Sequence, residues 1–232
     1  MSENVITMKS EKKEKNAEKK LEGFVSKNRK LLLIIFCVLV LAAVVLCVCL
    51  AVRDFGIKKG IKAVDSIEYS YTKDSENLSE EEIAERKNSA IAELSAYVSK
   101  SGVVGTRANL LAADIYFSQK NYEEALNSYK KAASSSKKAY TSPVACYNAG
   151  VCSEELGNLE DAYNFYALAC DSEDFYLVSH ALFTQGRVAE KLENYENAKN
   201  AYSKLVDSYP DDEWTELAQS RLIALKIAGK IN

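Results

Sequence analysis

One helical pattern occurs three times in this chain of 232 residues and limits its possible folds to a few. The three copies align without gaps, and they begin at Lys120, Gly157 and Glu193. They read KNYEEALNSYKKA, GNLEDAYNFYALA and ENYENAKNAYSKL, and their starts are 37 and then 36 residues apart. Self-similarity at a period of this size is typical of stacked helical repeats.

Each copy places a small residue four positions before a tyrosine. These pairs are Ala125 and Tyr129, Ala162 and Tyr166, and Ala198 and Tyr202. A second helical stretch precedes each copy and carries its own small residue, which is Ala113, Gly150 or Gly186. Small residues let two antiparallel helices approach closely, and a large aromatic side chain fills the next gap. The chain has only 9 glycines and 2 prolines, which also favours long helices over tight turns.

Several residues predict where these helices begin and end. An asparagine precedes the second helix of each copy and is expected to cap it; these are Asn121, Asn158 and Asn194. Ser79 and Glu82 form a predicted capping box for a helix that reaches about Lys100. Residues 213–228 carry apolar side chains on one face and are predicted to form a helix that covers the last repeat.

The small and aromatic columns, together with the closing Pro210, resemble the tetratricopeptide repeat over about residues 106–210. The family's tryptophan is absent from the first helix, where Asn109, Cys146 and Leu182 stand instead. The resemblance implies an α-solenoid of antiparallel helix pairs in which the first helix of each pair lines a groove. The alternative is an unrelated helical bundle.

The resemblance also places the fifth and ninth positions of each repeat in that groove. These positions and one neighbour hold Leu110, Asp114, Phe117, Tyr147, Val151, Phe183 and Arg187. Family members that clamp a C-terminal carboxylate carry Lys and Asn there, so no such clamp is expected. Leu110, Tyr147 and Phe183 are expected to form an apolar stripe that binds a segment of a protein partner, with Arg187 as the main cation. The alternative is that neighbouring helices of the chain cover this stripe.

An apolar run of 22 residues without a charge extends from Leu31 to Val52. As a helix it would span about 33 Å, which is enough to cross a bilayer. The run exceeds the usual length of a signal-peptide core and lacks a good cleavage site, so an uncleaved anchor is predicted, with a buried core helix as the alternative. Residues 11–30 carry eight Lys or Arg and residues 53–72 carry four, which predicts a cytoplasmic N-terminus.

The predicted architecture is therefore all-α, with an N-terminal transmembrane helix, a tetratricopeptide-type α-solenoid and a C-terminal capping helix. Residues 1–30 are expected to form a basic cytoplasmic tail, and residues 31–52 the transmembrane helix. Residues 53–101 are expected to form a juxtamembrane pair of helices, which is a candidate degenerate repeat. Residues 102–232 are expected to hold the repeats and the capping helix.

Composition and motifs argue against catalysis. The chain has one histidine, His180, and a net charge of −3. It has no CxxC motif, no metal-ligand spacing and no glycine-rich phosphate loop. We therefore expect no enzyme activity, cofactor, metal, nucleic acid or small-molecule substrate.

The leading hypothesis is a protein-interaction scaffold in the inner membrane of a bacterium, with its repeats facing the periplasm. The layout resembles the anchored tetratricopeptide family that accompanies the Sec translocon. This resemblance implies translocon subunits, chaperones or client polypeptides as partners. Two alternatives remain. One is a scaffold in outer-membrane assembly or cell-division coordination, because YSKLVDSYPDDEWTELAQSRL is similar to repeats in such proteins. The other is an accessory binding module for a soluble enzyme.

Overall fold

The computed structural model describes residues 2–135, 140–172 and 175–232, and their side chains from residue 23 onward. Every regular element in these ranges is a helix, which confirms the all-α prediction. The chain divides into two units, residues 1–56 and residues 57–232.

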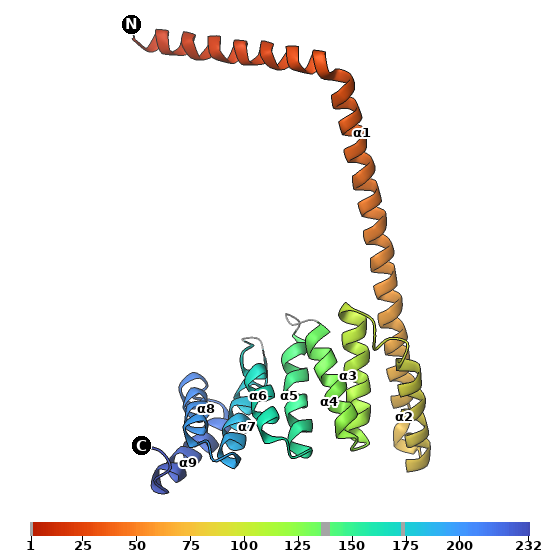
Figure 1. Cartoon of the computed structure of the whole chain (residues 1–232), viewed down its shortest axis with the longest axis vertical. Coiled ribbons are helices and arrows are strands. Elements are labelled where there is room, and N and C mark those ends of the chain that lie inside the picture. Colours follow the sequence, from red (N-terminus) through yellow and green to blue (C-terminus); the bar gives the residue numbers. More distant parts are fainter. Residues whose placement is uncertain (1, 136–139, 173–174) are drawn as a thin grey trace. The chain divides into compact units, whose positions relative to one another are not determined.

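The first unit lies within helix α1 (Ser2–Thr72), which continues into the second unit (Figure 1). An 18-residue window of this helix has a mean hydropathy of 3.6, and the described residues bury none of it. Apolar side chains such as Leu33, Phe36 and Leu41 are exposed. The helix is therefore long and apolar enough to span a membrane, and its apolar window is not buried by the described part of the chain.

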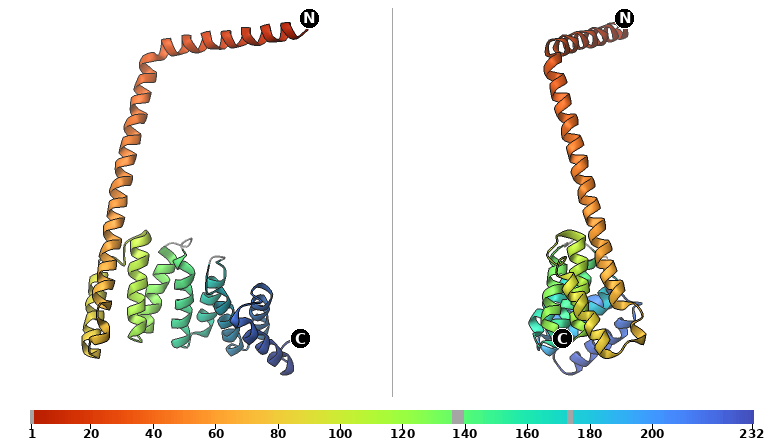
Figure 2. Two further views of the ribbon diagram at one scale, coloured as in Figure 1. Left: turned by 180° about the vertical axis from the view of Figure 1, so that it is seen from behind. Right: turned by 90° about the vertical axis from the view of Figure 1, so that its right-hand side faces the viewer.

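The second unit contains the end of α1, the short 3-10 helix η1 (Ser75–Asn77) and the helices from α2 to α9. Their bounds are α2 (Glu80–Leu94), α3 (Gly102–Ser118), α4 (Tyr122–Ser135), α5 (Thr141–Glu155), α6 (Leu159–Cys170), α7 (Val178–Lys191), α8 (Tyr195–Ser208) and α9 (Glu213–Ile227). Figures 1 and 2 show α3 to α9 stacked in chain order, with neighbours antiparallel. The pairs α3/α4, α5/α6 and α7/α8 are the three predicted repeats, and α9 follows them as the predicted capping helix.

Two glycines of the small-residue column lie directly against the tyrosine ring of the second helix. A Cβ atom added to Gly150 would lie 2.7 Å from the Tyr166 ring, and one added to Gly186 would lie 2.5 Å from the Tyr202 ring. Both tyrosines are buried. These distances are too short for any side chain unless the ring moves, so the pairing of glycine with tyrosine fixes how the two helices pack.

The predicted caps are only partly confirmed. The Ser79 backbone N–H donates to Glu82 Oε2 at 2.9 Å, and the Glu82 N–H donates to Ser79 Oγ, so the capping box is present. Asn194 Oδ1 accepts from the Asn197 N–H at 3.2 Å, as expected. The prediction for Asn158 is wrong, because its side chain makes no capping hydrogen bond.

The end of α1 and helix α2 pack against α3. Val64, Leu94 and Ile115 belong to one buried cluster there. Asn109, which stands in the column of the family's tryptophan, is buried, and its Nδ2 donates to the carbonyls of Val98 and Gly105 at 2.8 Å. These hydrogen bonds compensate the burial of the amide and tie α3 to the turn that follows α2.

Candidate functional site

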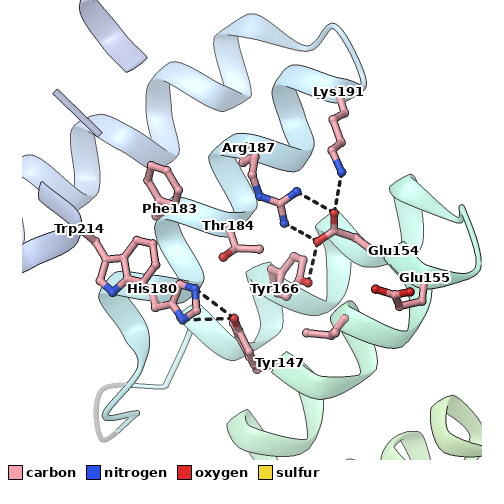
Figure 3. A pocket seen from close by; sticks show the side chains of 11 residues that line it. Tyr147, Glu154, Glu155, Tyr166, His180, Phe183, Thr184, Arg187, Lys191 and Trp214 are labelled. Atoms are coloured by element: carbon pink, nitrogen blue, oxygen red, sulfur yellow. Dashed lines mark hydrogen bonds and ion pairs between the residues drawn. The ribbon is translucent and has the colours of Figure 1, made fainter. Parts of the chain in front are cut away.

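A pocket of about 580 Å³ lies along α5 and α7 and is closed at one end by the start of α9 (Figure 3). Five aromatic rings, including the imidazole of His180, and two glutamates are among its lining residues. The full lining is Tyr147, Val151, Glu154, Glu155, Tyr166, His180, Phe183, Thr184, Arg187, Lys191 and Trp214.

The aromatic side of the pocket is a row of rings in contact. The rings of His180 and Trp214 are stacked, with 4.0 Å between centroids and 11° between planes. Phe183 packs against Trp214 at 5.2 Å, and Tyr147 packs against His180 at 5.5 Å. The Tyr147 hydroxyl also lies 3.3 Å from Nδ1 of His180. Tyr147 of this row comes from α5, and His180 and Phe183 come from α7. Trp214, at the start of α9, lies at the end of the row (Figure 3).

The polar side of the pocket centres on Glu154. Arg187 donates to both oxygens of this carboxylate, at 2.9 and 2.6 Å, and Lys191 Nζ donates at 3.0 Å. The Tyr166 hydroxyl donates to Oε2 at 2.9 Å. Burial alone would raise the pKa of Glu154, but these hydrogen bonds outweigh it and hold the pKa below its ordinary value. The carboxylate is therefore ionised at neutral pH and neutralises much of the charge of both cations.

The same arrangement recurs one repeat later. Tyr202 donates to Glu190 Oε1 at 2.6 Å, and Arg221 Nε donates to the same oxygen at 2.9 Å. In each case a glutamate accepts one hydrogen bond from the tyrosine of its own helix pair. It accepts another from an arginine of the helix that follows that pair, α7 or α9. The first repeat differs, because Tyr129 donates to Asp114 Oδ1 at 2.5 Å.

The structure brings four of the seven predicted groove residues into this pocket: Tyr147, Val151, Phe183 and Arg187. The other three lie outside its lining. Leu110 and Phe117 pack against the cluster formed by α3, α4 and α5, and Asp114 bonds Tyr129. A binding role for any of the seven stays a prediction.

Sequence reasoning missed the glutamates and two of the four rings in the aromatic row, His180 and Trp214. Glu154 and Glu190 are 36 residues apart, which is the spacing of the last two copies, so the repeat itself carried a signal for them. His180 and Trp214 gave no such signal, because only the packing of α9 against α7 brings their rings together.

The chemistry of the pocket favours binding over reaction. Burial lowers the pKa of His180, with a further contribution from Arg187, so the imidazole is neutral at pH 7. Burial raises the pKa of Cys152 and of Cys170 to about 12, so neither thiol is a ready nucleophile. No group of metal-ligating side chains occurs among the residues whose side chains the structure describes.

Sequence models described as tetratricopeptide repeat match residues 106–138 and 180–212. These matches cover the first and third helix pairs. Two stretches of this chain therefore match the tetratricopeptide repeat. Such repeats are generally interaction modules without enzyme activity, and neither matching tetratricopeptide model describes a catalytic family.

A "TPR repeat-containing protein" of Treponema pallidum (strain Nichols) is 32% identical over 130 residues, which is 56% of this chain. The aligned part covers 54% of that relative, so the chain spans about half its length. The crystal structure of apo RapI superposes on 68% of this chain and 46% of its own, with a TM-score of 0.51 and 21% identity. That likeness shows the fold alone. A crystal structure of MamA covers 59% of this chain and 78% of its own, with 18% identity and a TM-score of 0.46.

Proposed function

We propose that this chain is a single-pass membrane-anchored scaffold whose tetratricopeptide pocket binds an apolar segment of a polypeptide partner. The observation that carries the proposal is the row of aromatic rings formed by Tyr147, His180, Phe183 and Trp214 beside one neutralised ion-pair cluster. Clustered aromatic side chains with a few polar groups are typical of protein-binding hot spots.

The charge pattern argues for an apolar ligand rather than a carboxylate. Arg187 and Lys191 are the cations of the pocket, and both already pair with Glu154. A ligand carboxylate would have to compete with that carboxylate for the same donors. An aromatic or aliphatic side chain could instead lie against the rings without breaking a hydrogen bond.

The membrane arrangement follows from α1. We propose that residues 1–30 lie in the cytoplasm, that residues 31–52 span the inner membrane of a bacterium, and that residues 53–232 face the periplasm. The apolar window in α1 supports a span, and the excess of Lys and Arg on its N-terminal side supports this orientation.

The proposed partners are translocon subunits, periplasmic chaperones or client polypeptides. The support is the resemblance in layout between this chain and the anchored tetratricopeptide family that accompanies the Sec translocon. The aromatic pocket suits such partners, because unfolded or emerging polypeptides expose apolar side chains that a folded protein buries.

Photo-crosslinking in intact cells tests the partner. A photoreactive amino acid in place of Tyr147 or Phe183 should crosslink to translocon subunits, chaperones or nascent chains. The same amino acid in place of Tyr69, an exposed tyrosine on α1 of the same unit, is the control and should not crosslink to them. Recovery of none of these proteins from either pocket position would refute the proposed partners.

A reporter protein fused after Asn232 tests the orientation. A reporter that is active only outside the cytoplasm should be active there. Activity of a reporter that works only in the cytoplasm would show that the repeats lie on the other side.

A further inference from the structure

Helix α9 has one buried face and one exposed apolar face. Thr215, Ala218 and Leu225 are buried against the preceding helices. On the opposite side, Leu217 is 48% exposed, Ile223 is 60% exposed and Ile227 is 83% exposed. At 100° per residue these three side chains, with Ser220 and Ala224 between them, form one continuous stripe. This stripe requires an explanation, because contiguous apolar side chains on an exposed face usually mark an interaction surface.

The corresponding face of α7 is covered. Arg187 and Arg221 are 34 residues apart, and each binds the glutamate of the preceding first helix, so they occupy equivalent positions. The same shift relates Gly186 to Ser220 and Ala189 to Ile223. Gly186 lies under the Tyr202 ring of α8, and Ala189 is fully buried. The stripe on α9 is thus the face on which a tetratricopeptide first helix receives its second helix, and no described residue covers it.

The order of side chains along the stripe matches a second copy of the same helix. Leu217 and Ile223 lie three residues before and after Ser220. If a second α9 runs antiparallel and crosses at Ser220, Leu217 of each copy lies against Ile223 of the other. The small serine at the crossing lets the two backbones approach closely.

The charges of α9 favour the same pairing. Glu216 in the first turn lies within the angular span of the stripe, Lys226 in the last turn lies beside it, and both are exposed. Within the described residues neither side chain forms an ion pair. An antiparallel copy brings each Glu216 close to the partner's Lys226, whereas a parallel copy would place like charges together. Antiparallel helix dipoles add to this preference.

We propose that the exposed stripe of α9 is a self-association surface, and that two copies of this chain pair through it as an antiparallel, two-fold symmetric dimer. This symmetry is the commonest among soluble oligomers, because one self-complementary patch suffices. One helix from each copy buries less than the roughly 1,600 Å² of a standard interface, so we expect a reversible dimer with a dissociation constant of about 10 μM.

Disulfide trapping of the full chain in detergent micelles tests the crossing point. The background replaces Cys37, Cys47 and Cys49 by alanine and retains the three buried cysteines. Ser220→Cys should give a covalent dimer on mild oxidation, because the dyad brings the two thiols together. Gln219→Cys is the matched control, since its side chain lies about 100° away around the helix and should give little dimer. Equal trapping at both positions, or none at Ser220→Cys, would overturn the proposal.

Sedimentation velocity of the same chain, without added cysteines, measures the strength of the contact. Leu217→Asp should weaken dimerisation at least 100-fold by placing two buried charges at the interface, while the thermal unfolding of the repeats is unchanged because Leu217 is exposed. Glu216→Lys alone should weaken it about 10-fold, and Glu216→Lys combined with Lys226→Glu should restore it. A chain that stays monomeric up to about 100 μM, or a dimer indifferent to Leu217→Asp, would refute self-association through α9.

Discussion

Replacing Gly186 by alanine adds a single methyl group at the closest approach of α7 and α8. The new Cβ would lie 2.5 Å from Cε1 of Tyr202 and 2.8 Å from two further ring atoms. The ring has little room to retreat, because Tyr202 is fully buried and its hydroxyl is held by Glu190 at 2.6 Å. The methyl group must therefore displace the ring, the helix or both.

Two opposing effects set the size of the change. Alanine favours the helix over glycine by about 1 kcal/mol. Overpacking a well-filled core costs about 1–3 kcal/mol, and a displaced Tyr202 loses a hydrogen bond to a carboxylate worth about 1.5–3 kcal/mol. The unfavourable effects exceed the favourable one, so Gly186→Ala should lower the free energy of unfolding by about 1.5–5 kcal/mol.

Urea unfolding followed by tryptophan fluorescence measures this change. Trp214 is the only tryptophan of the chain and contacts α7, so its signal reports the repeats rather than the apolar part of α1. Ser220→Ala is the matched control, because Ser220 is the equivalent residue of α9 and is exposed. That variant should be neutral or more stable by up to about 0.5 kcal/mol. A stability of Gly186→Ala equal to or above that of the wild type would refute the packing argument.

Three further changes have predictable effects. Glu154→Gln should lower the free energy of unfolding by about 1–2 kcal/mol, since the hydrogen bonds from Arg187 lose their charged acceptor, whereas Glu155→Gln at the exposed neighbour should have almost no effect in the same urea titration. The pKa of His180 is lower in the folded chain than in the unfolded chain, so its contribution to stability is complete above about pH 6.5 and is lost as the pH falls through the folded value. As the pH is lowered through that range, the urea concentration at the midpoint of unfolding should therefore decrease. A His180→Gln variant should show a smaller decrease. Ser79→Ala should cost about 1 kcal/mol by removing the capping box of α2, and amide hydrogen exchange in the first turn of that helix should speed up; unchanged exchange there would contradict this.

The part of the fold that repeats could be predicted from the sequence. Glycine and tyrosine recur at fixed positions because each helix pair packs in the same way, so Gly150 with Tyr166 and Gly186 with Tyr202 reveal the pairing of helices before any coordinates. The resemblance to the tetratricopeptide repeat predicts that Tyr147, Val151, Phe183 and Arg187 share one groove, and all four line the pocket.

The part of the site that depends on the stacking of repeats could not be predicted in this way. The contact between His180 and Trp214 depends on how far α9 rotates relative to α7, which no local pattern encodes. Phe117 is a position at which the first repeat departs from the pattern of the later repeats. It stands where the later repeats have Glu154 and Glu190, so the first repeat has no equivalent glutamate network, and Phe117 instead packs against Tyr122 with 5.4 Å between ring centroids.

Trp214 belongs to the helix that carries the exposed stripe, and its ring closes the pocket on the other side. A ligand that shifts α9 through contact with this ring would change the surface that a second copy meets. Binding energies obey reciprocity, so the factor by which such a ligand alters dimerisation is the factor by which dimerisation alters the ligand's affinity. Helix α9 would then couple ligand binding in the pocket to dimerisation of the chain. The contact between His180 and Trp214 would link the two.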